Sequence, residues 1–182
     1  MFNNWYNVFP EITEISDEAL QKQVIAVCQD ALEIGGWQLD DLEQIPFTLL
    51  IPNTKFSYRT HVRAVTRMAM RCYEEWQVYG ERFALNHDYL IAGGLLHDVG
   101  KLIEYEKNSA GETVKSALER NLRHPFSGTA LAVKHGIPYE IAHIIANHAH
   151  EGDGTLRSPE AVIINKCDML NFQALKSFAG MI

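Results

Sequence analysis

Residues 92–103, with the sequence AGGLLHDVGKLI, place a histidine and an aspartate side by side in a segment that is otherwise mostly apolar. Burying an ionised carboxylate is strongly unfavourable unless a cation or several hydrogen bonds compensate it. Neighbouring residues of a helix point about 100° apart around its axis, so His97 and Asp98 can approach one metal ion from different directions. The two oxygens of the Asp98 carboxylate could also bridge two ions. This pair therefore predicts a buried helical segment that contributes to a metal site.

The residues on either side of this pair carry two further expectations. Gly93 and Gly94 lie one turn before His97, and each costs a helix about 1 kcal/mol relative to alanine. We expect them to remove side-chain bulk where another helix approaches closely. Lys101 lies one turn after the pair, where its ammonium could hold an anionic oxygen near the metal. The alternative is a surface lysine that the helix dipole favours at a helix end.

Apolar residues recur with helical spacing along most of the chain, and patterns typical of strands are nearly absent. Caps, glycines and prolines predict helices at residues 16–34, 57–79, 88–102, 124–135 and 138–150, and a last helix that begins at Ser158. Residues 46–52 begin and end with proline and are expected to form a short strand or a buried irregular segment. Residues 104–121 are polar and rich in turn-forming residues, and they are expected to form an exposed loop with a short helical end. The expected fold class is all-α, a single-domain helical bundle, which a chain of 182 residues can form.

Three other predicted helices also carry a metal-ligating residue type on an apolar face. These residues are His61, His148 and Asp168. A single histidine in such a place is usually a core residue with a hydrogen-bond partner. The recurrence of the pattern on separate helices favours a metal cage instead, and imidazole with carboxylate suits manganese, iron, cobalt, nickel or zinc.

A stripe of arginines four residues apart follows the opposite face of the helix predicted at residues 57–79. The simpler interpretation is a solvent-exposed face, and the alternative is that one or two of these side chains reach an anionic ligand. The stripe consists of Arg59, Arg63, Arg67 and Arg71.

Composition narrows the classes of partner. The formal net charge of −7 argues against a nucleic-acid or membrane-surface binder. No apolar run approaches the length of about 18 residues that a membrane span needs, and the first residues lack the pattern of a secretory signal. The three cysteines are widely spaced and predict reduced thiols rather than a disulfide framework. We therefore expect a cytoplasmic protein whose partner is a small molecule.

The order His61, His97-Asp98, Asp168 resembles the H…HD…D signature of the HD-domain superfamily of metal-dependent phosphohydrolases, and LLHDVGK is very similar to its central motif. The resemblance covers roughly residues 57–175. It implies an HD-type metal-binding domain at residues 57–182 and an N-terminal extension at 1–56 that packs on it. In this extension, Trp5, Tyr6, Trp37 and the run at 45–50 are expected to serve packing. The alternative is that one of its aromatic residues lines the substrate pocket.

Two further segments, RHPFSGTALAVKHGIP and IIANHAHEGDG, resemble those that supply extra ligands in the binuclear branch of the superfamily, which includes the HD-GYP type. The resemblance implies that His124 and His148 complete a second metal site, with Asp98 as the bridge. The first metal is then held by His61, His97, Asp98 and Asp168. Where the HD-GYP type has two consecutive histidines and a glutamate, this chain reads HAHE, and the GYP tripeptide is absent. His150 is therefore a replacement ligand, a substrate contact or an exposed residue.

The activity that the resemblance implies is hydrolysis of a nucleotide or another small phosphate ester by a metal-activated water. Asp98 and Lys101 would be the catalytic residues, with Lys101 and His150 in contact with the substrate. The cofactors would be two divalent ions of manganese, iron, zinc, cobalt or nickel. Two other classes stay open. One is an HD-type di-iron oxygenase with a similar ligand set, and the other is a non-catalytic HD signalling module, a class that usually loses its ligands.

Overall fold

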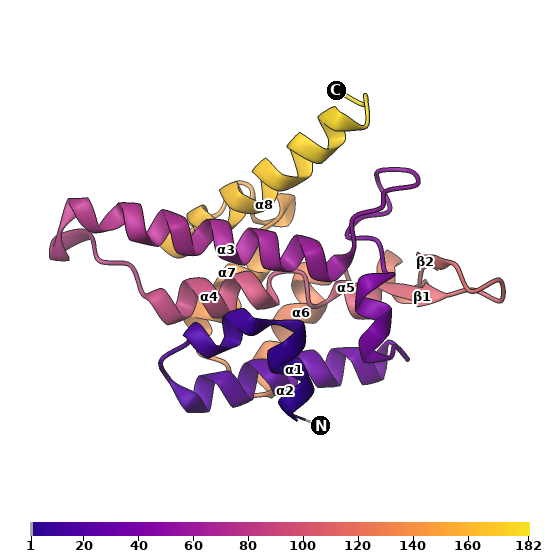
Figure 1. The fold of residues 1–182 in the computed structure, drawn as a ribbon, viewed down its shortest axis with the longest axis horizontal. Coiled ribbons are helices and arrows are strands. Elements are labelled where there is room, and N and C mark those ends of the chain that lie inside the picture. Colours follow the sequence, from indigo (N-terminus) through magenta and orange to yellow (C-terminus); the bar gives the residue numbers. More distant parts are fainter. Residues whose placement is uncertain (1) are drawn as a thin grey trace.

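The computed structural model describes residues 2–182, with side chains from residue 4 onward, and these residues form mainly helices (Figure 1). The helices are α1 (Phe2–Val8), α2 (Glu18–Ile34), α3 (Tyr58–Trp76), α4 (His87–Leu96), α5 (Lys101–Glu104), α6 (His124–Lys134), α7 (Tyr139–Asn147) and α8 (Pro159–Phe178). Strands β1 (Tyr105–Lys107) and β2 (Thr113–Lys115) pair in one small antiparallel hairpin. The predicted all-α class is confirmed.

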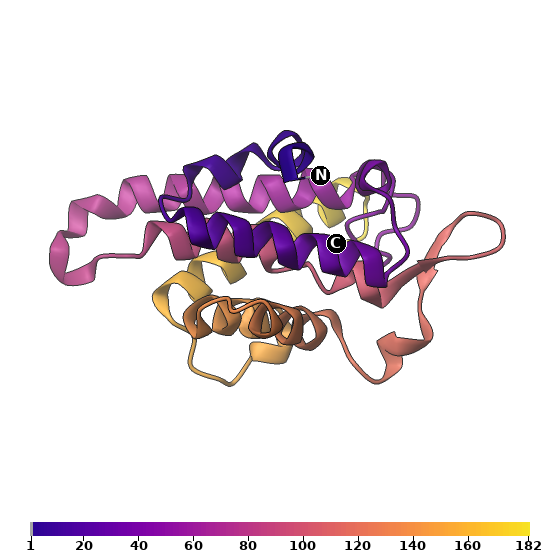
Figure 2. The ribbon, with the colours of Figure 1, turned by 90° about the horizontal axis from the view of Figure 1, so that it is seen from below.

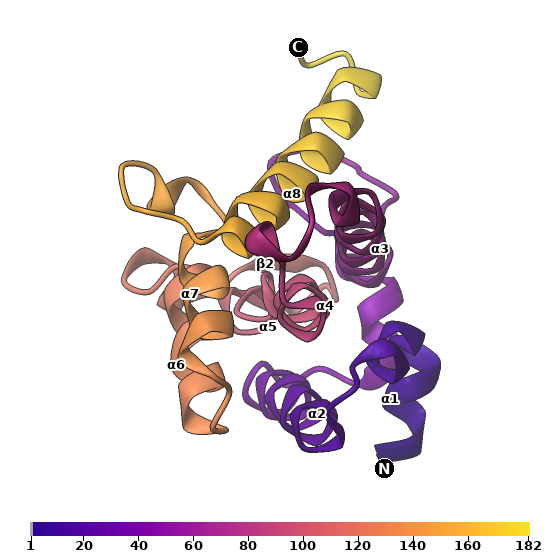
Figure 3. The same ribbon diagram turned by 90° about the vertical axis from the view of Figure 1, so that its left-hand side faces the viewer.

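Helix α4 lies at the centre of the bundle, in contact with α2, α3, α7 and α8 (Figure 3). Residues 90–96 of this helix are all buried. A helix that is apolar on every side is stable only in the interior of a protein. The segment that carries the His97–Asp98 pair therefore enters the core as the sequence predicts.

The two glycines of α4 allow the close helix approach that was expected of them. A Cβ atom on Gly94 would lie 2.9 Å from the Cα atom of Thr66 in α3. A Cβ atom on Gly93 would lie 2.9 Å from the side chain of Ile144 in α7. Two neighbouring helices thus pack directly against the α4 backbone, one turn before His97.

The N-terminal residues share one hydrophobic core with the helices of the bundle. Trp5 and Trp37 are both buried in the same cluster as Leu95 of α4. The indole of Trp37 donates a hydrogen bond to the Leu102 carbonyl at 2.8 Å. The packing role predicted for these two tryptophans is confirmed, whereas the domain boundary after residue 56 stays a prediction.

The arginine stripe of α3 is solvated only in part. The guanidinium of Arg59 bonds to Glu43 and donates to the Val8 carbonyl, and Arg63 forms an ion pair with Glu11 at 3.0 Å. The expectation of a solvated face is thus wrong for these two arginines, because residues of the N-terminal extension pack over that end of α3. Arg67 and Arg71 are exposed as predicted.

The helix predicted over residues 88–102 is interrupted, which corrects the sequence-based expectation. Helix α4 ends at Leu96, and residues 97–100 form a turn before the short helix α5. The ring of His97 donates from Nδ1 to the Gly94 carbonyl at 2.7 Å, which a continuous α-helix would pair with the Asp98 amide. Beyond this point the chain tightens to i→i+3 hydrogen bonds, such as Lys101 N–H to the Asp98 carbonyl at 2.9 Å.

The two segments that were expected to be largely irregular, residues 104–121 and 46–52, differ in how well they were predicted; the short helical end of the first is the 3-10 turn Ala117–Arg120. Residues 104–121 were expected to be a loop with a short helical end, yet they also contain the β1–β2 hairpin. Its turn is closed by the Asn108 side chain, which accepts from the Ala110 and Glu112 amides, and by Gly111 at φ +79°. Residues 46–52 form the irregular alternative, apart from one isolated bridge between Pro46 and Ser57.

The molecule is elongated along α3, with the hairpin projecting at one end and the turn between α3 and α4 at the other (Figure 2). The C-terminal half of α8 extends away from the bundle (Figure 1). Among residues 2–182, none of the helices combines the length and apolar character that a membrane crossing needs.

Gly94→Ala is expected to lower the free energy of unfolding by about 1–3 kcal/mol, because the new methyl group would meet the Thr66 backbone and overpacked sites cost that much. Helix propensity alone predicts the opposite sign, a gain of about 1 kcal/mol. Urea denaturation followed by circular dichroism separates the two. Unchanged or increased stability would contradict close packing of α3 on α4.

Candidate metal centre

All six residues predicted as metal ligands converge in the interior of the bundle. They form two groups, and within each group the potential ligand atoms lie within 4.8 Å of one another. The first group is His61 of α3, His97 of the turn after α4, and Asp168 of α8; the second is Asp98 of the same turn, His124 at the start of α6, and His148 just after α7. Separate elements of the chain thus bring these side chains to one place.

The Asp98 carboxylate lies between the two groups and faces each with a different oxygen. Its Oδ2 atom is 3.3 Å from Nε2 of His61 and 3.4 Å from Nε2 of His97. Its Oδ1 atom is 3.3 Å from Nε2 of His124 and 3.5 Å from Nε2 of His148. This is the arrangement that a bridging carboxylate between two metal ions requires.

The four imidazoles of the site share one orientation: each Nδ1 contacts a hydrogen-bond acceptor, and each Nε2 faces Asp98. The acceptors are Oδ1 of Asn171 for His61 (2.8 Å), the Gly94 carbonyl for His97 (2.7 Å), Oε2 of Glu104 for His124 (2.8 Å) and the Ile145 carbonyl for His148 (2.7 Å). Each Nδ1 must therefore carry a proton, so in the neutral rings the Nε2 lone pairs point inward. A second contact of this kind typically accompanies a histidine that binds metal.

A metal ion fits these donor atoms, because one of them has no hydrogen-bond partner within the described part of the protein. Nε2 of His148 is buried and has no hydrogen-bond partner among the described residues. It lies 3.5 Å from Oδ1 of Asp98, and in the neutral ring with its proton on Nδ1 both of these atoms are acceptors. A cation at this place would satisfy both, and the mixed nitrogen and oxygen donors suit a divalent transition metal.

The electrostatics of the site also favour positive charge. Burial lowers the pKa of His61, but its hydrogen bonds to Asp168 and Asp98 outweigh burial and raise the pKa to about 9. Burial raises the pKa of Asp168, but the hydrogen bond from His61 together with electrostatic interactions with His97 and His61 outweighs it and brings the pKa to about 2. Protons and metal ions therefore compete for the same atoms, as they do in metal sites generally.

Lys101 is mostly buried, and the interpretation as a surface lysine is wrong. Its Nζ atom donates to Oδ2 of Asp98 at 2.7 Å and to the Phe47 carbonyl at 2.8 Å. Burial raises the pKa of Asp98, but Lys101 and His97 outweigh it and hold that pKa well below the usual range. An ammonium has three N–H donors, so one of them is left for a further partner.

A cavity of about 260 Å³ opens onto this cluster, and Asp98, Lys101, His124 and Asp168 form its floor. Its remaining wall is largely apolar and comes from residues 47–50 together with Met169 and Phe172 of α8; Lys115 and Arg123 add positive charge. A larger hollow of about 350 Å³ beside the hairpin contains none of the six converging residues.

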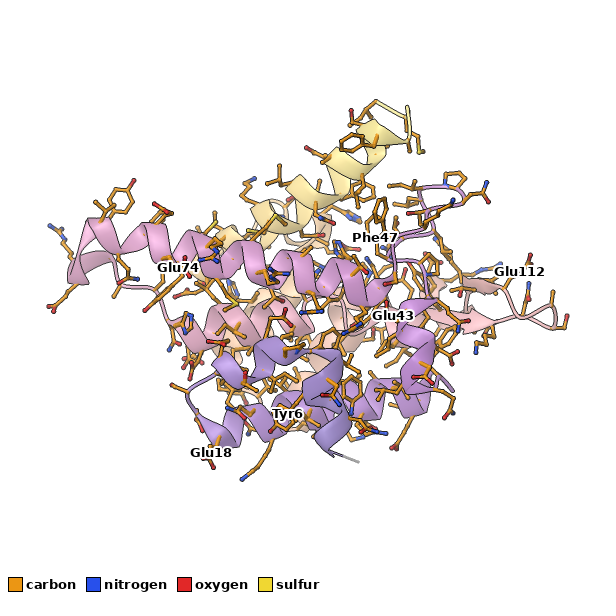
Figure 4. All side chains as sticks on the ribbon, in the orientation of Figure 1. Tyr6, Glu18, Glu43, Phe47, Glu74 and Glu112 are labelled. Atoms are coloured by element: carbon orange, nitrogen blue, oxygen red, sulfur yellow. The ribbon has the colours of Figure 1, made fainter. Side chains whose placement is uncertain are left out.

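Phe47, labelled in Figure 4, connects the N-terminal extension with this cavity. Its ring packs against the His61 ring with centroids 4.8 Å apart and meets Phe172 at 6.3 Å. An aromatic residue of the extension, Phe47, thus lines the cavity, while Trp5 and Trp37 pack in the core; that the cavity binds the substrate stays a prediction. Sequence periodicity carried no signal for this role, because residues 46–52 belong to no regular element.

His150 does not join the converging residues. Its side chain is 71% exposed and lies at the edge of the same cavity, with Nδ1 3.1 Å from Oε2 of Glu151. Of the three interpretations, the exposed position is observed, and a substrate contact stays a prediction. Arg123 was overlooked, although its place directly before His124 in the sequence could have indicated it.

Lys101→Met is expected to lower the free energy of unfolding by about 3 kcal/mol when a chelator is present, because it leaves the buried Asp98 carboxylate without its cation. Lys134→Met is the matched control. Its ion pair with Asp30 spans 2.7 Å, but the Lys134 side chain is 61% exposed, so its loss costs less than about 1 kcal/mol. Urea denaturation of both variants measures the difference, and equal losses would contradict the buried role of Lys101.

Comparison with known proteins agrees with this geometry. The family model of the HD domain matches residues 58–172, a range that contains all six converging residues. The chain is also 30% identical over 166 residues to the dihydroneopterin 2',3'-cyclic phosphate phosphodiesterase of Methanocaldococcus jannaschii. That alignment covers 85% of this chain but only 64% of the relative, so the chain spans under two thirds of the relative's length. No solved structure matches the chain. The matched range, with its histidines and aspartates gathered around Asp98, shows that the chain belongs to the HD-domain family.

Proposed function

We propose that the chain is a metal-dependent phosphodiesterase that uses two divalent metal ions. The observation that carries the proposal is the Asp98 carboxylate, whose two oxygens face two separate groups of inward-pointing ligand atoms. The first ion would be held by His61, His97, Asp98 and Asp168, and the second by Asp98, His124 and His148. Family membership and the phosphodiesterase relative support the hydrolase class.

The proposed substrate is a small cyclic phosphate diester, such as the 2',3'-cyclic phosphate of a nucleoside or a pterin. The name of the relative supports this class, and so does the cavity that opens onto the cluster. Its positive residues suit a phosphate, and its apolar wall suits an attached ring system. Hydrolysis would add water across one P–O ester bond and leave a phosphate monoester and a free hydroxyl on the same molecule.

Bound divalent ions would supply a nucleophilic water at neutral pH and neutralise charge on the phosphoryl oxygens. Asp98 would hold both ions at a set spacing. Lys101 would keep the Asp98 carboxylate in place and donate its third N–H to a phosphoryl oxygen. Arg123 at the cavity would add a planar guanidinium that can contact a second oxygen.

The other two classes receive less support. A non-catalytic signalling module of this family usually loses its ligands, whereas all six candidates are present and converge in this chain. A di-iron oxygenase would use the same nitrogen and oxygen donors, but the relative is a phosphodiesterase. Metal analysis of protein purified without chelator, combined with oxygen-consumption assays, distinguishes hydrolase from oxygenase.

The direct test of activity is a panel of phosphate esters assayed with Mn²⁺, Fe²⁺ or Zn²⁺. It should include 2',3'-cyclic nucleotides, dihydroneopterin 2',3'-cyclic phosphate, 3',5'-cyclic nucleotides and simple monoesters. We expect turnover of 2',3'-cyclic diesters and about two metal ions per chain. Protein that binds fewer than two ions, or that hydrolyses none of these esters, would contradict the proposal.

Asp98→Ala is expected to abolish turnover and most of the stabilisation that metal confers. Binding of an ion to the native state alone stabilises it by about 2.7 kcal/mol when the ion is at 100 times its Kd. Melting curves with chelator and with excess Mn²⁺ should show a large gain for the unaltered protein and a much smaller one for the variant.

Asp30→Ala is the matched control, because Asp30 pairs with Lys134 and His135 and is not among the converging residues. Its metal-dependent gain should equal that of the unaltered protein. Equal gains in the Asp98 and Asp30 variants would show that Asp98 is not the central ligand.

A further inference from the structure

A buried glutamate that the sequence analysis overlooked lies directly behind His124. The side chain of Glu104 is almost inaccessible to solvent, at 3% exposure. Its Oε2 atom accepts hydrogen bonds from both the backbone N–H and the Nδ1–H of His124, each at 2.8 Å. One oxygen thus ties the imidazole to the backbone of its own residue. This double contact holds Nε2 of the ring toward Oδ1 of Asp98, 3.3 Å away.

The position of this carboxylate explains how it can be buried. Helix α6 begins at His124, and its N-cap residue, Arg123, supplies no side-chain cap. Glu104 provides the missing acceptor from the neighbouring helix α5, and a negative charge is favourable at a helix N-terminus. The Nε atom of Arg123 lies 3.4 Å from the same oxygen and adds a weaker cationic contact.

His124 differs in this respect from the other three imidazoles of the site. Their Nδ1 atoms contact neutral oxygens, from the Asn171 amide or from backbone carbonyls, whereas the Nδ1 of His124 contacts a carboxylate. A carboxylate partner fixes the tautomer of a histidine and makes its opposite nitrogen a stronger metal ligand.

The spacing along the chain brings Glu104 into place. Asp98, Lys101 and Glu104 are three residues apart. The amides of Lys101, Leu102 and Ile103 make i→i+3 hydrogen bonds, and only the amide of Glu104, the last residue of α5, bonds four residues back, to the Gly100 carbonyl. Side chains at this spacing lie one above the other in such a turn. Lys101 therefore meets Asp98, and Glu104 meets the next ligand, His124, along one side of the segment.

We propose that Glu104 is a positioning residue of the second metal site, where its charge and its Oε2 atom set the orientation and donor strength of His124. This inference rests on the proposed two-metal function. It predicts that the two ions depend on different supporting residues, with Glu104 behind one site and Asn171 behind the other.

The test is a calorimetric titration. Metal is first removed from the protein with a chelator, the chelator is removed, and the heat of Mn²⁺ binding is then measured. Glu104→Gln keeps an acceptor oxygen and removes the charge, and Glu104→Ala removes both. We expect Glu104→Gln to weaken one of the two Mn²⁺ equivalents about 10-fold to 100-fold and to leave the other unchanged. Glu104→Ala should weaken the same equivalent at least as much. Asn171→Ala, the matched variant behind His61, should weaken the other equivalent.

A double-mutant cycle separates positioning from a general structural effect. In a His124→Ala background, Glu104→Gln should cause no further loss of Mn²⁺ binding, because the ring through which it acts is gone. Asn171→Ala should keep its full effect in that background. If Glu104→Gln leaves both Mn²⁺ equivalents unchanged, or weakens both equally, the inference is overturned and the two-metal function still stands. An unaltered protein that binds fewer than two ions overturns both.

If Glu104→Gln does not fold, as judged by circular dichroism without metal, the unaltered protein still decides the question. Nitrogen-15 NMR of the metal-free protein reports which ring nitrogen of His124 carries the proton. The inference expects the proton on Nδ1, and a proton on Nε2 would overturn it.

Discussion

The burial of the Asp98 carboxylate is the constraint on which the rest of the structure depends. The side chain is 1% exposed, so its charge must be balanced by groups of the protein itself or by a bound cation. Lys101 and the surrounding imidazoles provide that balance, but only if four helices and a turn meet at one place. Glycines make this meeting possible: a Cβ atom on Gly100 would lie 2.1 Å from the His124 carbonyl, and one on Gly94 would lie 2.9 Å from the Thr66 Cα atom in α3. The close packing of the helices is therefore also what brings the charged groups of the site together around Asp98.

The interruption after α4 belongs to this arrangement as well. A continuous α-helix would repeat every 3.6 residues and carry Glu104 away from the direction of Asp98. The ring of His97 instead takes the Gly94 carbonyl, and the chain tightens into i→i+3 hydrogen bonds over the following residues. The local loss of regular helix thus places a ligand, a cation and a supporting carboxylate on one side of a short segment.

The N-terminal extension contributes to the site although the family match begins at residue 58. Phe47 accepts a hydrogen bond from Lys101 with its carbonyl and covers His61 with its ring. Residues 47–50 form part of the cavity wall, so the segment both supports the cluster and shapes the space next to it. The family-matched region therefore supplies the converging residues, and the extension supplies part of the wall of the cavity beside them.

The sequence by itself determined the all-α class and most of the helices, because apolar periodicity and local caps act within a few residues. It also placed His61, His148 and Asp168 on apolar helix faces and the His97–Asp98 pair in an apolar segment. The resemblance to the HD-domain superfamily then added His124. The sequence also indicated that Gly93 and Gly94 allow another helix to approach closely. The tertiary structure decided the break after Leu96, the hairpin at residues 105–115 and the contact of Arg59 and Arg63 with the extension. It also decided the acceptors behind His61 and His124; Asn171 is 110 residues from His61, and Glu104 is 20 residues from His124. Such contacts join segments that are distant along the chain, so no local pattern can encode them.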